Sequence, residues 1–246
     1  MLYVSNINGD GGAKDGNGYI TQVSPEGKVL KKEWIGDLHA PKGMALRDNK
    51  LYVADVDQLI EIDVITAQIS KRYPAKGATF LNNVAIDLQG NVYTSDSRST
   101  TPTTIYKLSE GTLSAWLSNP AVKMTNGLHS ETAFLIAAAG DSTAENPSNA
   151  RYLQTIHLKT KEVNPLTNAT PLGNIDAIEA DGHGGYFLSD WAAGKVLHFT
   201  PAQGAKLILQ PGDGTADLDY IAKTQMLYLP IMLSHELAAY RVIWEQ

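Results

Sequence analysis

Five polar residues stand at nearly the same distance ahead of five apolar anchor residues. Each lies 10 or 11 residues before the centre of a short aromatic or aliphatic run. The polar residues are Lys42, Asn82, Asn126, Asp176 and Asp217, and their anchors are Tyr52, Tyr93, Ile136, Phe187 and Tyr228. Carboxylate and amide oxygens are hard ligands of the kind that bind Ca²⁺, Mg²⁺ or Mn²⁺. Because the offset is shared, we expect these side chains to occupy equivalent places in a repeated structure.

Each of these residues, taken singly, also has an ordinary structural explanation. Asn and Asp at the start of a strand often satisfy the backbone N–H groups of the preceding turn. The set as a whole favours a functional site, because all five residues share nearly the same offset. Carboxylates brought close together repel each other unless a cation or the ammonium of Lys42 neutralises part of their charge. We therefore predict that the five residues form one site, with Asp217 among its metal-binding residues and Lys42 among its substrate-binding residues.

The anchors themselves recur along the whole chain. They centre on Tyr3, Tyr52, Tyr93, Ile136, Phe187 and Tyr228, at intervals of 49, 41, 43, 51 and 41 residues. This is the period of a propeller blade. Each full unit places a short small-residue strand and a turn before the anchor, and two more strands after it. We predict an all-β, six-bladed β-propeller with little helix, since a β-sandwich does not explain six matching anchors.

The repeat is incomplete at both ends of the chain. The units span about residues 1–37, 38–76, 77–120, 121–170, 171–212 and 213–246, within one predicted propeller domain. The first unit begins at its second strand and the last stops after its third, which predicts 22 strands where six full blades need 24. We expect a seam between residues 1–8 and 236–246, caused by residues that precede Met1 and are missing from this sequence.

The first strand of each propeller blade lines the central channel, so the recurring polar positions would meet at its mouth. The loop between the second and third strands of a blade opens on the same face. The long loops 97–104 and 140–151 belong to this class, and such loops usually carry specificity. Arg98 and Arg151, which lie in these loops, are predicted to bind a substrate carboxylate.

Three of the segments that carry the polar residues are similar to motifs of a known family. They are residues 81–87 (LNNVAID), 125–128 (TNGL) and 175–181 (IDAIEAD). These segments resemble the gluconolactonase, regucalcin and senescence-marker-protein family, whose six-bladed propellers include metal-dependent lactonases. The resemblance implies that Asn126 and Asp176 are metal ligands and that Asn82 faces the substrate.

The chain departs from the family pattern at three places. The Glu ligand that the family takes from its first blade has no counterpart here, because it would belong to the strand that we expect to precede Met1. Asn83 stands where the family usually has Asp, and Ala177 stands where it usually has Gly. These differences leave open a non-catalytic propeller that binds a protein partner or a small ligand through its loop face.

Amino-acid composition excludes several classes of binding partner and of catalytic site. The net charge of −6 and the pI near 5.5 offer no basic surface to nucleic acid or to an anionic membrane. The absence of cysteine excludes thiolate zinc sites and a cysteine nucleophile. No apolar run of 18 residues and no secretory leader is visible, and neither the compartment nor the oligomeric state follows from the sequence.

Together these patterns predict a divalent-metal-dependent hydrolase that acts on a lactone or a similar small ester. The predicted cofactor is Ca²⁺, with Mn²⁺, Mg²⁺ or Zn²⁺ as alternatives. Asp176 is the predicted general base, in addition to its role as a ligand. The partner expected from this reading is a small-molecule substrate.

Overall fold

A computed structural model describes the chain except for residues 99–102, 141–150, 168–170 and 245–246. It divides into two compact units, Met1–Thr132 (unit 1) and Ala133–Gln246 (unit 2). The described residues form 22 strands and two short 3₁₀ helices, η1 (Pro120–Val122) and η2 (Met232–Ser234). This confirms the predicted strand number and low helix content. Among the described residues, no helix is long and apolar enough to cross a membrane.

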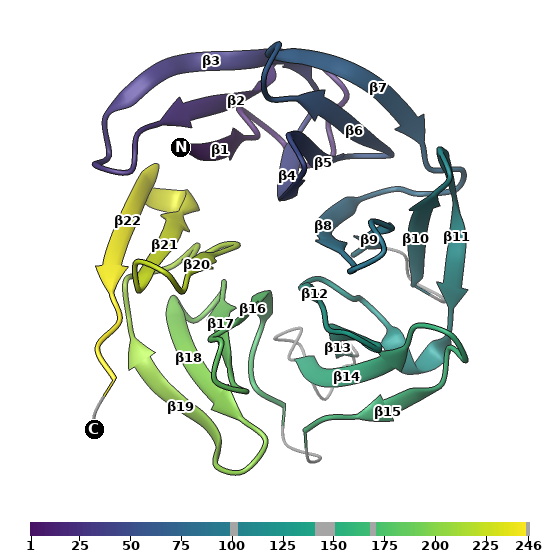
Figure 1. Cartoon of the computed structure of the whole chain (residues 1–246), viewed down its shortest axis with the longest axis vertical. Coiled ribbons are helices and arrows are strands. Elements are labelled where there is room, and N and C mark those ends of the chain that lie inside the picture. The colour runs from purple at the N-terminus through teal and green to yellow at the C-terminus, as the bar shows by residue number, and fades with distance from the viewer. Residues whose placement is uncertain (99–102, 141–150, 168–170, 245–246) are drawn as a thin grey trace. The chain divides into compact units, whose positions relative to one another are not determined.

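Unit 1 contains the strands of the first three sheets and the start of the fourth. The strands are β1 (Leu2–Asn6), β2 (Gly18–Val23), β3 (Val29–Leu38), β4 (Pro41–Arg47), β5 (Lys50–Asp55), β6 (Gln58–Asp63), β7 (Gln68–Pro74), β8 (Leu81–Ile86), β9 (Val92–Asp96), β10 (Thr104–Ser109), β11 (Thr112–Ser118) and β12 (Leu128–Ser130). The strands β4, β8 and β12 follow one another along this unit, and each is in contact with the next (Figure 1).

Unit 2 continues with the remaining strands. They are β13 (Phe134–Gly140), β14 (Arg151–His157), β15 (Val163–Pro165), β16 (Ile175–Ala180), β17 (Tyr186–Asp190), β18 (Lys195–Thr200), β19 (Gly204–Leu209), β20 (Asp219–Ile221), β21 (Met226–Ile231) and β22 (Glu236–Arg241). Within this unit β16 contacts both β13 and β20.

The strands form six antiparallel sheets in which neighbours in the sequence are neighbours in the sheet. The orders are β1-β2-β3, β4-β5-β6-β7, β8-β9-β10-β11, β12-β13-β14-β15, β16-β17-β18-β19 and β20-β21-β22. The first and last sheets have three strands each, as the repeat count predicts. The chain is a six-bladed β-propeller, which confirms the predicted fold class.

Strand pairing gives every blade two distinct ends. Pro41 at the start of β4 pairs with Asp55 at the end of β5, and Arg47 at the end of β4 pairs with Lys50. The start of each inner strand therefore lies beside the loop between the second and third strands. We call this the loop end of the blade, and the opposite one the hairpin end. The residues predicted to form the site belong to the loop end.

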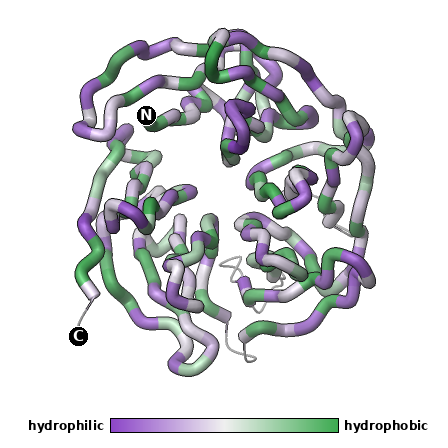
Figure 2. The backbone as a smooth tube through the Cα atoms, viewed as in Figure 1, coloured by the Kyte–Doolittle hydropathy of each residue, from purple (hydrophilic) through white to green (hydrophobic). Residues whose placement is uncertain are grey.

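The hydrophobic cores lie between consecutive sheets. In unit 1 one core joins Leu38 and Ile20 of the first sheet to Val53 and Ile60 of the second. Further cores join the second sheet to the third, the fourth to the fifth, and the fifth to the sixth. Figure 2 shows hydrophobic stretches alternating with hydrophilic ones along the strands, as expected where the side chains of a strand alternate between packed and exposed environments.

Candidate functional site at the loop ends of the blades

A β-bulge interrupts the inner strand of three blades at the predicted positions. The register shifts fall between Pro41 and Met44 in β4, between Leu81 and Val84 in β8, and between Ile175 and Ile178 in β16. Lys42, Asn82 and Asp176 are each the first residue inside their own bulge. Bulges re-aim side chains and are common beside active sites. The common offset read from the sequence thus corresponds to the same local structure in three blades.

Asn126 and Asp217 lie in the segments that lead into the two shortest inner strands. Each stands two residues before its strand, β12 or β20. Asn126 is buried, whereas Asp217 is half-buried. Asn82 is also half-buried, and its side chain makes no hydrogen bond with any residue that the structure describes. Its amide is therefore available to a ligand.

Two residues not assigned from the sequence hold the segment of Asn126 in place. The Asn83 backbone N–H donates to Ser95 Oγ at 3.2 Å, and the Ser95 hydroxyl donates to the Asn126 carbonyl oxygen at 2.8 Å. Asn83 Oδ1 accepts a hydrogen bond from the Leu128 N–H at 3.1 Å. Asn83 thus links β8 to the start of β12 within unit 1.

The aspartates that end the second strands have a structural role. Asp55 accepts hydrogen bonds from the N–H groups of His39 and Ala40, at 3.0 and 2.7 Å from Oδ1. Asp96 accepts from the N–H groups of Thr79 and Phe80 in the same way. Both carboxylates therefore fix the backbone just ahead of an inner strand. The sequence shows that these aspartates recur, but their partners are visible only in the structure.

In unit 1 the structure brings Lys42 and Arg98 together on one aromatic ring. The Lys42 ammonium lies 4.2 Å from the centre of the Phe80 ring, and the Arg98 guanidinium carbon lies 3.8 Å from it. Lys42 also donates to the Ala40 carbonyl oxygen at 2.8 Å. Burial, with a further contribution from Arg98, lowers the pKa of Lys42 to about 8, against the opposing charges of Asp55 and Asp10.

In unit 2 Arg151 is a buried neighbour of Asp176. Its side chain donates to Asn174 Oδ1 and, at 3.2 Å, to the Ile175 carbonyl oxygen, which fixes the backbone ahead of Asp176. Burial lowers the pKa of Arg151, and the charges of Asp176 and Asp190 oppose that shift. Arg151 thus lies close to the predicted general base. Its predicted contact with a substrate stays a prediction.

Asp217 contributes to an acidic neighbourhood in the same unit. Removal of Glu179 from water, together with the charges of Asp219 and Asp217, raises the pKa of Glu179 well above its usual value. The pKa of Asp219 is raised as well, through desolvation. A cation bound here would lower both pKa values, because it would favour the ionised carboxylates.

The predicted metal ligands fit a divalent cation in the chemistry of their donor atoms. Asn126, in unit 1, offers an amide oxygen, and Asp176 and Asp217, in unit 2, offer carboxylates. Oxygen donors of these kinds suit a hard cation such as Ca²⁺. Over the part of the chain that the structure describes, no three His, Cys, Asp or Glu side chains gather into a metal-binding group. The metal ion, its identity and its ligands therefore stay predictions.

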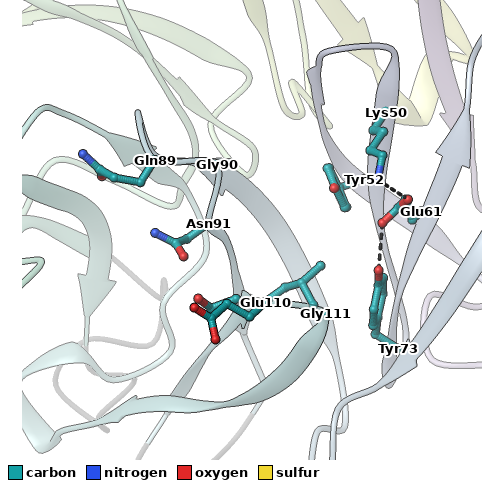
Figure 3. A pocket seen from close by; sticks show the side chains of 11 residues that line it. Lys50, Tyr52, Glu61, Tyr73, Gln89, Gly90, Asn91, Glu110 and Gly111 are labelled. Carbon is teal, nitrogen blue, oxygen red and sulfur yellow. Dashed lines mark hydrogen bonds and ion pairs between the residues drawn. The ribbon is translucent and has the colours of Figure 1, made fainter.

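A cleft at the hairpin ends of the second and third blades contains none of the predicted residues. It has a volume of 380 Å³ and is lined by Lys50, Glu61, Tyr73, Asn91 and Glu110, among others (Figure 3). Glu61 accepts hydrogen bonds from the Lys50 ammonium at 2.9 Å and from the Tyr73 hydroxyl at 2.8 Å. The buried charge in this cleft is therefore already paired, as is typical of a structural ion pair.

Loops 97–104 and 140–151 are described only in part. Residues 99–102 and 141–150 lie outside the described residues. Arg98 and Arg151 are described, and both belong to the loop ends of their blades.

Comparison with known proteins gives matches only among solved structures. No family model and no curated protein matches the chain. A gluconolactonase from Xanthomonas campestris is similar with a TM-score of 0.65 and 14% identity, over 87% of this chain and 75% of that one. The similarity is one of fold.

Two further structures share this fold and have different roles. A chain of a nidogen/laminin complex is 12% identical with a TM-score of 0.65, over 94% of this chain and 92% of that one. A catalytically inactive virginiamycin B lyase from Staphylococcus aureus, bound to quinupristin, is 12% identical with a TM-score of 0.61, over 94% and 75%. A gluconolactonase among the matches agrees with the resemblance noted in the sequence, at the level of the fold. The same skeleton carries both catalysis and protein binding, so function has to be argued from the site.

Proposed function

We propose that the protein is a divalent-metal-dependent hydrolase of a lactone or a similar small ester. The observation that carries the proposal is the bulge shared by β4, β8 and β16, which places Lys42, Asn82 and Asp176 at equivalent loop-end positions. The gluconolactonase fold and the oxygen donors of Asn126 and Asp176 support the same chemistry.

The residues of the chain have separate tasks in this proposal. Asp176 accepts the proton of the attacking water, since a carboxylate can act as a general base. Asn82 orients the substrate through its available amide. Asn126 and Asp176 are the proposed ligands of the cation. When bound, the cation would polarise the substrate carbonyl and lower the pKa of a water molecule.

Purified protein tests this proposal directly. Hydrolysis of D-glucono-δ-lactone, of aryl lactones and of D-glucaro-1,4-lactone, which carries a free carboxylate, is followed after treatment with a chelator and again after addition of Ca²⁺, Mn²⁺, Mg²⁺ or Zn²⁺. The proposal predicts that the chelator abolishes hydrolysis and that at least one cation restores it. Equal hydrolysis in chelator and in every cation, or none under any condition, would contradict it.

One observation favours a second candidate function. Lys42 occupies the same bulge position as Asn82 and Asp176, and Arg98 adds a second positive charge beside it. Positive charge at this position disfavours a neighbouring cation. A non-catalytic propeller that binds a small ligand or a protein through the loop ends would show ligand binding in chelator and no turnover with any cation.

A further inference from the structure

The proposed hydrolysis gives no task to a pair of cations that lie on Phe80 in unit 1. Lys42 projects from the bulge of β4, and Arg98 follows the end of β9, so two neighbouring blades supply them. An aromatic face attracts cations, and this explains why Phe80 holds two like charges together despite their repulsion. The cost of that repulsion would fall if an anion bound between them.

Neither cation is neutralised by an acid of the described chain. Lys42 gives one hydrogen bond to the Ala40 carbonyl oxygen, which leaves two of its three donors. The Arg98 side chain is exposed, and its guanidinium makes no hydrogen bond or ion pair with any described residue. With respect to the described residues, the two groups thus have seven N–H donors without an acceptor, two from Lys42 and five from Arg98.

The nearby acids are engaged with backbone groups instead. Asp55 accepts from the N–H groups of His39 and Ala40, and Asp10 accepts from the Gly12 N–H at 2.7 Å. Both acids act on Lys42 only through their charge, in the direction that raises its pKa. The negative charges of Asp55 and Asp10 reduce the positive potential around Lys42, but they accept none of its hydrogen bonds. A singly charged anion is therefore favoured over a doubly charged one.

The loop between β1 and β2 passes close to these side chains and carries glycine there. A Cβ atom on Gly12 would lie 3.3 Å from the Arg98 guanidinium nitrogen Nη1, and one on Gly11 would lie 3.3 Å from the edge of the Phe80 ring. Because these residues lack side chains, the loop approaches the ring without occupying the space beside the guanidinium. Arg98 therefore stays accessible from solvent.

We propose that Lys42 and Arg98 form a binding site for a carboxylate group of a small organic ligand. The planar fork of a guanidinium matches the two oxygens of a carboxylate, and the compact ammonium adds a second contact. Within the proposed function, this defines the substrate class as a lactone or ester that carries a carboxylate. The identification of the ligand as a substrate rests on the proposed function. Carboxylate binding itself does not, since it requires neither a metal ion nor turnover.

The pKa of Lys42, read from the NMR signals of its ¹³C-labelled side chain, tests the site in the intact protein. The probe is D-gluconate in the presence of a chelator, so that no metal ion contributes, and D-glucose is the neutral control. We expect D-gluconate to raise the Lys42 pKa from about 8 by about one unit, because the carboxylate favours the charged ammonium. D-glucose should leave it unchanged. No shift with D-gluconate would overturn the proposal, and so would an equal shift with inorganic phosphate, which would indicate a general anion site.

Substitutions distinguish binding at Lys42 and Arg98 from a general effect of the positive charge of the protein. Arg98→Gln should weaken D-gluconate binding about tenfold, since one charge-assisted contact is lost. Arg241→Gln, at an exposed position of β22, and Lys28→Met, at an exposed turn of unit 1, should bind D-gluconate as the wild type does. Equal weakening in the Arg241→Gln control would contradict a specific site. If D-gluconate binds normally while no lactone is hydrolysed, the site stands and the proposed function fails.

Discussion

The hydroxyl of Ser95 donates a hydrogen bond of 2.8 Å to the backbone carbonyl of Asn126. Ser95 is fully buried in β9, and the same oxygen accepts the Asn83 N–H at 3.2 Å. One serine thus connects the bulge of the third blade to the segment that carries a proposed metal ligand. Ser189 Oγ accepts the Ala177 N–H at 3.0 Å beside the bulge of β16. A serine that supports the bulge therefore recurs in both units.

Replacing Ser95 with alanine should destabilise the protein. The change leaves the Asn83 N–H and the Asn126 carbonyl without this buried partner, which typically costs about 1–3 kcal/mol. Urea unfolding followed by circular dichroism measures the difference in free energy of unfolding. Ser114→Ala, at an exposed position of β11, is the matched control and should change stability little. Equal stabilities of the two variants would contradict the role assigned to Ser95.

Gly173 should be required for packing as well as for its backbone conformation. Its φ is +138°, and a Cβ atom there would lie 2.1 Å from Asp190 Oδ2. Gly9 has a similar φ of +147°, but its Cβ would meet nothing closer than 3.8 Å. Gly173→Ala should therefore lower the free energy of unfolding by about 2 kcal/mol more than Gly9→Ala does. Similar losses in the two variants would show that conformation alone, without the contact with Asp190, explains the glycine.

The stability of the protein should depend on pH through Lys42. Because the pKa of Lys42 is lowered in the folded state to about 8, the unfolded chain binds more protons than the folded one between pH 8 and pH 10.5. Folding stability attributable to Lys42 should therefore rise with pH across that window, by at most about 1.4 kcal/mol per pH unit. Asp55 and Asp10 moderate this shift, and Arg98 increases it.

Lys42→Met is the variant that isolates this effect, since it keeps the stem on Phe80 and removes the charge. Its stability advantage over the wild type should be largest below pH 8 and should shrink as the pH rises towards 10.5. Lys28→Met, at an exposed turn, should show no such trend. Urea unfolding at several pH values decides the question. A difference between Lys42→Met and wild type that does not change with pH would contradict a lowered pKa.

The fold could be predicted from the sequence because its signals are local and repeated. Anchors such as Tyr52 and Tyr93 recur at the period of one blade, and each is buried in a second strand. The common offset of Lys42, Asn82 and Asp176 correctly indicated equivalent positions, which the structure shows to be bulges.

The finer contacts of the site could not be predicted, because they join residues far apart in the sequence. Nothing near Phe80 in the chain indicates that its ring would hold both Lys42 and Arg98. The recurring Asp55 and Asp96 were visible as a pattern, yet their function as acceptors for backbone N–H groups depends on how the preceding loop folds back.

Lactone hydrolysis by Asp176→Asn is the most direct test of the proposed function. The substitution preserves the shape of the side chain and removes its charge, so it should abolish proton acceptance and weaken cation binding. We predict that cation-dependent hydrolysis falls about 10³-fold, whereas Asp48→Asn, which makes the same change at an exposed hairpin, retains the wild-type rate. Asp176→Asn that folds normally and hydrolyses lactones as fast as Asp48→Asn would contradict the account.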